Sequence, residues 1–167
     1  MTRSRDVATQ GGLVLINTTT IGSAVSSVTI SNCFSATYQN YLITLNGTVG
    51  SQQGTLGIKF NNSTGSTYKR NGYYQTYAST TVSGDVGTGG TSSYIGMYNT
   101  VMGNFTSTIY SPFLTSRTAF TSQYATDIEA GVWNGYDTNS ASNTGFILTA
   151  SAGTVTGGTI EVYGYRN

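Results

Sequence analysis

The stretch YLITLNGTV, residues 41–49, decides the fold class, because apolar and polar side chains alternate along it. Alternation with a period of two is typical of a β-strand that is buried on one face. The expected inward face holds Tyr41, Ile43, Leu45 and Val49, and the expected outward face holds Thr44, Asn46 and Thr48. An antiparallel sheet that meets water on one side requires this pattern.

Further segments of the chain alternate in the same way. They are residues 55–61, 104–110, 127–134, 144–151 and 159–166. Clusters of Ser, Thr, Gly and Asn separate them, and no segment keeps helical apolar spacing for three turns. Two or three strands cannot bury such faces alone, so we expect about eight to ten strands in two packed sheets. The predicted fold is all-β: an antiparallel, jelly-roll-like β-sandwich.

The domain organisation follows from length and charge. A chain of 167 residues suggests one domain, which we place at residues 13–167. Residues 1–12 are expected to form an extended N-terminal arm that needs a partner surface to be ordered. Arg3, Arg5 and Asp6 give this arm its charge, and we expect them to contact that partner surface.

Other local signals concern turns. Residues 61–66 and 83–91 are rich in Ser, Thr, Gly and Asn and are predicted to be loops. The dipeptide Asn71-Gly72 favours a tight turn or a bulge. Pro112, the one proline of the chain, is expected to end a strand.

Composition excludes several kinds of chemistry. The chain has no His and one Cys, so it lacks a His base, a His-based metal site and an internal disulfide. Cys33 is expected to be a small buried hydrophobe. A net charge of +1 gives no footprint for duplex nucleic acid. Asp85 and Asp137 lie in Gly- and Asn-rich segments without the spacing of a calcium loop, so we expect no metal and no cofactor.

The sequence also bears on location. Its apolar runs are too short to cross a bilayer, and no secretory signal peptide is recognisable. We therefore expect a protein that is made in a cytoplasm and does not insert into a membrane.

The best acidic pair is Asp127 and Glu129. At positions i and i+2 of a strand their side chains share a face, together with Trp133, while Ile128 and its alternate neighbours face the core. An aromatic ring beside carboxylates suits a sugar, and the spacing is near that of a glycosidase pair. A solvated strand face without any ligand is the simpler interpretation.

The segment YKRNGYYQTY, residues 68–77, mixes aromatic and basic side chains. Tyr73, Tyr74 and Tyr77 are candidate contacts for a glycan or another protein subunit, because tyrosine gives rigid contact area at low entropic cost. Its two basic residues are too few to favour single-stranded nucleic acid.

Four segments carry a resemblance to a known family. They are SRDVATQGGL (4–13), CFSATYQNY (33–41), IYSPFL (109–114) and GTIEVYGYRN (158–167). The chain resembles small virion structural proteins of tailed, marine-type bacteriophages, of the head-decoration or tail-fibre kind. The resemblance implies a virion location and self-association, and its motifs include no catalytic residues.

Three functions remain open at this point. The first is a non-enzymatic capsid decoration protein, a homotrimer whose partners are other virion proteins. The second is a tail-fibre tip or adhesin that binds a host glycan. The third, more distant, is a glycan hydrolase that uses Asp127 and Glu129.

Overall fold

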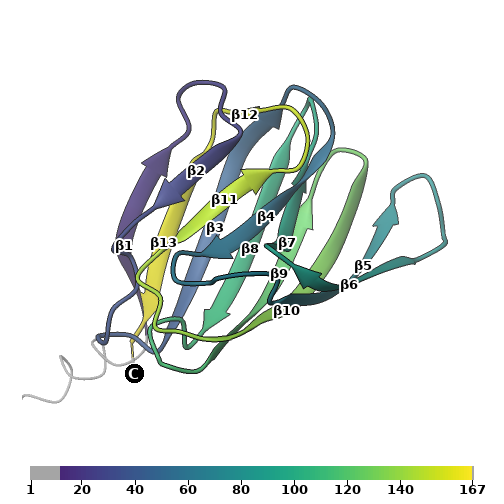
Figure 1. The fold of residues 1–167 in the computed structure, drawn as a ribbon. Helices are drawn as coiled ribbons and strands as arrows, with labels where there is room; N and C mark the ends of the chain where they lie inside the picture. Colours follow the sequence, from purple (N-terminus) through teal and green to yellow (C-terminus); the bar gives the residue numbers. More distant parts are fainter. Residues whose placement is uncertain (1–11, 167) are drawn as a thin grey trace, which may run out of the picture.

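The computed structural model describes residues 12–166 and is all-β, with antiparallel sheets packed together (Figure 1). The strands are β1 Leu13–Thr20, β2 Ser27–Ile30, β3 Asn40–Gly50, β4 Gly54–Phe60, β5 Tyr68–Thr76, β6 Ser83–Gly90, β7 Ser93–Tyr98, β8 Gly103–Tyr110, β9 Arg117–Ala125, β10 Glu129–Ser140, β11 Phe146–Ala150, β12 Val155–Thr156 and β13 Thr159–Tyr165. Within the described range there is no helix. The predicted fold class is confirmed, although the strands number thirteen. The predicted N-terminal arm, with Arg3, Arg5 and Asp6, lies outside the described residues.

Two sheets form the sandwich. The larger has the strand order β1-β13-β3-β8-β9-β10-β5-β6, with β12 attached to β3, and the smaller has the order β2-β11-β4-β7. Figure 1 shows the smaller sheet lying across the face of the larger one. Each sheet therefore has one face toward the other sheet and one face toward water.

The strand pairing is nested. β1 pairs with β13, β2 with β11, β3 with β8 and β4 with β7. A long antiparallel hairpin that folds over itself gives this nesting, and the folding brings β13 beside β3 and β11 beside β4. This is the double-sheet jelly roll expected from the sequence.

Four strands extend the larger sheet beyond the jelly roll. β5 and β6 are inserted between β4 and β7, and β9 and β10 follow β8. From the smaller sheet, the edge strand β7 packs against β8, β9, β10 and β5. The β5–β6 hairpin protrudes from the sandwich in Figure 1. The inner face of the larger sheet is thus left partly uncovered near β5 and β6.

The core fills the space between the sheets, as the alternation predicted. Apolar side chains expected to face inward are buried: Tyr41, Ile43, Leu45, Leu56, Ile58, Phe60, Phe105, Ile109, Phe146, Leu148, Ile160 and Val162. Cys33 is also buried. β8 ends at Tyr110, shortly before Pro112, as expected.

The end of β3 departs from the prediction. Thr48 is buried and Val49 is only partly buried, the reverse of the expected arrangement. The register against β8 shifts between Leu45 and Thr48, and Gly47 there has a φ of +76°. A bulge inserts one extra residue and so exchanges the two faces of the strand beyond it.

Two turn predictions are wrong. Residues 83–91 were expected to form a loop, but β6 occupies most of this range and pairs with β5. Asn71 and Gly72 lie in the middle of β5 rather than in a turn. Backbone hydrogen bonds to β5 hold β6 in place, so few large side chains are needed there. Residues 61–66 form a loop, as predicted.

We expect the protein to lose stability at high pH. Burial raises the pKa of the Cys33 thiol from 9.0 to about 12, and that of Tyr68 from 10.0 to about 12. In the unfolded chain these two groups lose their protons at a lower pH than in the folded protein. Their protonated forms therefore stabilise the fold fully below about pH 9, and this stabilisation is lost as the pH rises toward about 12. Urea unfolding at about pH 8 and about pH 11 measures this loss, and equal midpoints would contradict it. A thiol reagent should leave native Cys33 unmodified at about pH 8.

Candidate functional site

The acidic pair of the sequence is separated in the structure. Asp127 precedes β10, is exposed, and accepts a hydrogen bond from the Asn99 side chain. Glu129 opens β10 and is buried, with 4% of its surface exposed, and Trp133 on the same face is 3% exposed. The prediction that Glu129 and Trp133 face water is wrong, because both point toward the interior of the sandwich.

The outward face of β10 also differs from the prediction. Ala130 and Val132 were expected in the core, but they are only partly buried, and Ile128 is exposed. The inward positions alternate with them and are Glu129, Gly131, Trp133, Gly135 and Asp137. Glycine and acidic residues occupy most of these inward positions. The alternation of apolar and polar residues in the sequence therefore does not indicate that this face points inward.

Glycines on the neighbouring strands make room for the large inward side chains. Trp133 pairs with Gly72 of β5, and a Cβ at Gly72 would overlap the indole ring. A Cβ at Gly131 would lie 2.8 Å from the rings or side chains of both Tyr124 and Tyr74. A Cβ at Gly87 of β6 would overlap the guanidinium group of Arg70. The role of Gly72 is therefore to give space to Trp133, which explains why it sits mid-strand.

A pocket lies at the uncovered end of the sandwich, between β4, β5, β6, β7 and β10. Its volume is about 350 Å³. We call it the inner pocket, and its lining residues are Gln53, Thr55, Arg70, Tyr74, Gly84, Asp85, Tyr94, Met97, Glu129 and Trp133. It thus gathers three of the predicted site residues, Tyr74, Glu129 and Trp133, from two strands.

The charges in the inner pocket are held in fixed positions. Arg70 donates from Nε to Asp85 Oδ2 at 3.2 Å, and its guanidinium group lies 3.8 Å from the centre of the Tyr94 ring. Tyr94 in turn meets Trp133 edge to face, with ring centres 5.3 Å apart. With Glu129, the pocket holds one cation and two carboxylates and has a formal charge of −1.

One carboxylate oxygen of Glu129 accepts a hydrogen bond from a neighbouring side chain. Its Oε1 accepts a hydrogen bond from the Tyr124 hydroxyl at 3.0 Å. Burial and the Glu129 carboxylate raise the pKa of Tyr124, so the tyrosine remains a donor over the whole neutral range. Among the described residues no hydrogen bond reaches Oε2 of Glu129.

Two buried polar atoms of the pocket residues have no hydrogen-bond partner in the described chain. They are Nε1 of Trp133 and Oγ1 of Thr55. A buried indole N–H without an acceptor costs free energy, and such orphan groups are uncommon. Both atoms are enclosed by the protein, so a group in the inner pocket does not reach them.

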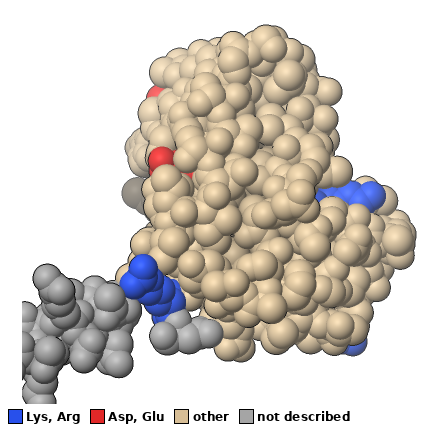
Figure 2. Space-filling model, turned by 90° about the vertical axis from the view of Figure 1, so that its left-hand side faces the viewer, with Lys and Arg blue, Asp and Glu red and all other residues tan. Residues whose placement is uncertain are grey.

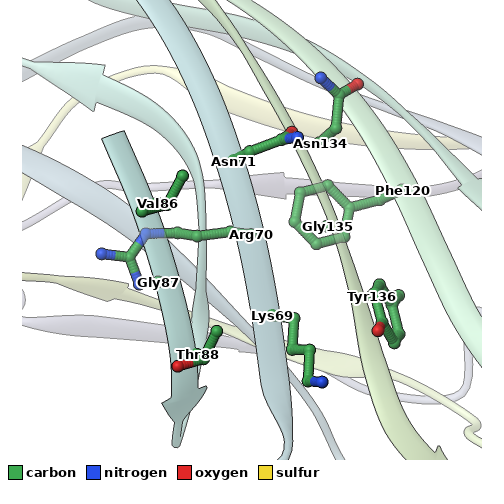
Figure 3. A pocket seen from close by; sticks show the side chains of 10 residues that line it. All are labelled: Lys69, Arg70, Asn71, Val86, Gly87, Thr88, Phe120, Asn134, Gly135 and Tyr136. Atoms are coloured by element: carbon green, nitrogen blue, oxygen red, sulfur yellow. The ribbon is translucent and has the colours of Figure 1, made fainter. Parts of the chain in front are cut away.

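A second concavity, the outer groove, lies on the opposite face of the same strands. It has a volume of about 460 Å³. Figure 3 shows its lining: Lys69, Arg70, Asn71, Val86, Gly87, Thr88, Phe120, Asn134, Gly135 and Tyr136. The paired row Phe120–Gly135–Arg70–Gly87 forms the floor, since these residues direct their side chains inward or have none. Apart from Lys69 its walls are uncharged. Of its polar side chains, Asn71 and Thr88 are exposed, and Asn134 and Tyr136 are partly buried.

The remaining predicted contacts lie on the hairpin. Tyr73 is on the outward face of β5 and Tyr77 follows the strand, and both are exposed. Tyr73 and Tyr74 thus lie on opposite faces, and only Tyr74 reaches the inner pocket. Arg70 and Tyr94 line the inner pocket although the sequence did not single them out. For Arg70, its position among the tyrosines of residues 68–77 was a signal.

The structure offers no candidate metal centre within residues 12–166, where no group of three or more His, Cys, Asp or Glu side chains converges. Asp85 and Asp137 are on strands rather than in loops, and Asp137 is buried. In the same range no helix is long and apolar enough to span a membrane. No protein-family model matches the sequence, and a search of curated proteins finds no match.

Proposed function

We propose that the protein is a non-enzymatic structural protein of a bacteriophage particle, a capsid decoration protein that forms homotrimers on the particle surface. The observation that carries this proposal is the exposed apolar surface of the β5–β6 hairpin. Val86 of β6 is 78% exposed, the most of any large apolar side chain among the described residues. Tyr73, Tyr77 and Val82 on the same hairpin are exposed as well. A cluster of this kind marks a site of protein association.

A second apolar surface lies at the other edge of the larger sheet. Leu13 and Leu15 of β1 are exposed, and Leu15 exposes 52% of its surface. Within residues 12–166, β1 and β6 are the two edge strands of this sheet, so each has one row of backbone groups without a strand partner in that range. In our proposal the hairpin of one copy packs against β1 of the next. A head-to-tail contact between two different surfaces closes into a ring when its rotation returns to the first copy, and a cyclic trimer requires such a contact.

The scarcity of charge supports association rather than catalysis or nucleic-acid binding. Charged residues make up 8% of the chain. Figure 2 shows a broad face on which charged side chains are few and far apart. Such a surface offers little electrostatic repulsion between copies. Residues 1–12, with Arg3, Arg5 and Asp6, are our proposed attachment to other virion proteins.

The trimer contact can be tested with two single variants. Val86→Asp removes the hairpin contact and Leu15→Asp removes the β1 contact, so each is expected to reduce the trimer to monomer in light scattering after size exclusion. Mixing the two variants should give a one-to-one dimer, because each retains the surface that the other lacks. If Leu15→Asp alone remained associated, the contact would join hairpin to hairpin and our arrangement would be wrong. Thr108→Asp, on the outward face of β8, serves as the charge control.

The place on the particle is tested by copy number. Quantitative mass spectrometry of purified particles should give hundreds of copies if the protein decorates the head. A few tens of copies or fewer would instead indicate a protein of the tail. A density map of the whole particle would locate it directly.

The second candidate function is that of a tail-fibre tip or adhesin that binds a host glycan. The inner pocket favours this candidate, since it combines aromatic walls with carboxylates. Binding of the isolated protein to host cells would support it. We do not propose glycan hydrolysis by Asp127 and Glu129, because one carboxylate is exposed and bound to Asn99 while the other is buried beside Tyr124.

A further inference from the structure

We propose that the inner pocket is a binding site for a single guanidinium group, with the Glu129 carboxylate as its counter-ion. This inference goes beyond the proposed function and does not depend on the trimer. The pocket lies under the hairpin, on the face of the sheet opposite Tyr73 and Val86. It is therefore separate from the surface proposed for self-association.

A buried carboxylate without a matching cation is the observation that carries the inference. Glu129 is 4% exposed and forms no ion pair with the described residues. Its Oε1 accepts the hydrogen bond from Tyr124, whereas Oε2 has no hydrogen-bond partner in that part of the chain. Oε2 is not among the polar atoms that the protein encloses, so it opens to the inner pocket that Glu129 lines. An unpaired buried charge costs free energy, and a cation in the pocket would offset this cost.

The neighbouring ion pair does not match this charge. Arg70 donates to Asp85 at 3.2 Å and is stacked on Tyr94, so its own charge is already compensated. The pocket keeps a formal charge of −1, which belongs to Glu129. An anion would be repelled by Glu129, and a neutral ligand would leave its charge uncompensated. One monovalent cation makes the pocket neutral.

The lining of the pocket favours an organic cation over a metal ion. Calcium and magnesium take roughly six or more oxygen ligands, and no group of three or more acidic, His or Cys side chains converges in the described part of the chain. Four lining residues carry an aromatic ring or a thioether: Tyr74, Tyr94, Met97 and Trp133. Such walls cannot replace the water around a strongly hydrated ammonium ion. A guanidinium group is more weakly hydrated, so its transfer into the pocket costs less.

The size and the opening of the pocket suit the same group. A volume of about 350 Å³ is near the lower end of the range for small-molecule sites, roughly 300–1,000 Å³. This space holds a guanidinium group and the alkyl chain that carries it. Gln53 and Gly84 are the exposed lining residues and form the rim through which the group enters. Because folding has already removed most water from Glu129, binding does not incur that cost again.

The test uses the full chain, with methylguanidinium chloride as the probe at constant ionic strength. Binding is followed by calorimetry and by the fluorescence of Trp133, which is the one tryptophan of the chain and lines the pocket. We expect saturable binding of methylguanidinium and severalfold weaker binding of methylammonium. Methylurea, which has nearly the same shape and no charge, should not bind. The inference is overturned if methylguanidinium shows no saturable binding, or if methylurea binds equally well.

Two carboxylate variants locate the probe. Glu129→Gln keeps the size of the side chain and an oxygen that can accept from Tyr124, so we expect it to fold and to bind methylguanidinium at least tenfold more weakly. Glu161→Gln makes the same change on the outward face of β13, where the carboxylate accepts from Tyr163, and should leave the affinity unchanged. If Glu129→Gln does not fold, Gln53→Lys serves in its place, because a positive charge at the exposed rim should weaken binding severalfold. An affinity that the pocket variant leaves unaltered would place the cation elsewhere and overturn the inference.

A second probe distinguishes two sources of the guanidinium group. If the capped tripeptide Ala-Arg-Ala binds as tightly as methylguanidinium or more tightly, the pocket takes an arginine side chain of another protein. If methylguanidinium binds and the tripeptide does not, the pocket takes a free small guanidinium compound. Either result supports the site. Neither bears on the trimer, which light scattering of Val86→Asp and Leu15→Asp tests separately.

Discussion

Val162→Asp is expected to leave the protein unfolded, or nearly so, at 25 °C. Val162 lies in β13, is fully buried in the core between the two sheets, and pairs with Ile43 of β3. A polar group buried without a partner costs roughly 2–7 kcal/mol, and the loss of two buried methyl groups adds about 1.5 kcal/mol. The total approaches the whole stability of a typical domain, about 5–15 kcal/mol. Circular dichroism and urea unfolding measure the effect.

The matched control is Thr106→Asp on β8. Thr106 is exposed on the outward face of the same sheet, so the new carboxylate meets water. We expect this change to cost less than about 1 kcal/mol, the span of strand propensities. A Val162→Asp protein with native unfolding behaviour would show that the inward face of β13 is assigned wrongly.

Gly72→Ala is expected to destabilise the protein by about 1–3 kcal/mol and to displace Trp133. The added methyl group would overlap the indole ring, and overpacking of this kind costs about that much. The backbone of Gly72 is not in the left-handed region, so the effect comes from space and not from backbone strain. Trp133 is the one tryptophan of the chain, so its fluorescence reports the displacement as a shift of the emission maximum.

Two companion variants isolate the cause. Gly84→Ala on the neighbouring strand β6 places its methyl group at an ordinary 3.6 Å from the nearest atom and should be close to neutral. Adding Trp133→Ala to Gly72→Ala should cost less than the sum of the two single changes, because the small side chain removes the overlap. Additive effects would mean that the indole ring does not lie over Gly72.

The sequence predicted the parts of the fold that depend on alternation. Strands such as β4 and β13 have large apolar side chains at every second position, and these are buried. The order of the strands was not predicted. It depends on which distant segments pair, and the pattern of a single sequence contains little information about such pairing. The bulge at Gly47 shows how one extra residue exchanged Thr48 and Val49 between the two faces.

The candidate site was only partly predictable. Glu129 and Trp133 were recognised as chemically useful, but their face was assigned wrongly because Ile128 and Val132 are the more apolar set. At the end of the sheet that the smaller sheet does not cover, the inner face need not be apolar. Arg70 and Asp85 come together because β5 pairs with β6, and the sequence of residues 83–90 gave no sign of a strand.

The nested pairing of the strands has a consequence for biosynthesis. Among the described strands, β1 pairs with β13, which is the last of them to be synthesised. Most contacts in the domain join residues far apart in sequence, a property that slows folding. β1 therefore lacks this partner, and its apolar residues stay exposed, until β13 has been synthesised. We expect the jelly roll to complete its folding only then, with chaperones binding the unpaired edge in the meantime.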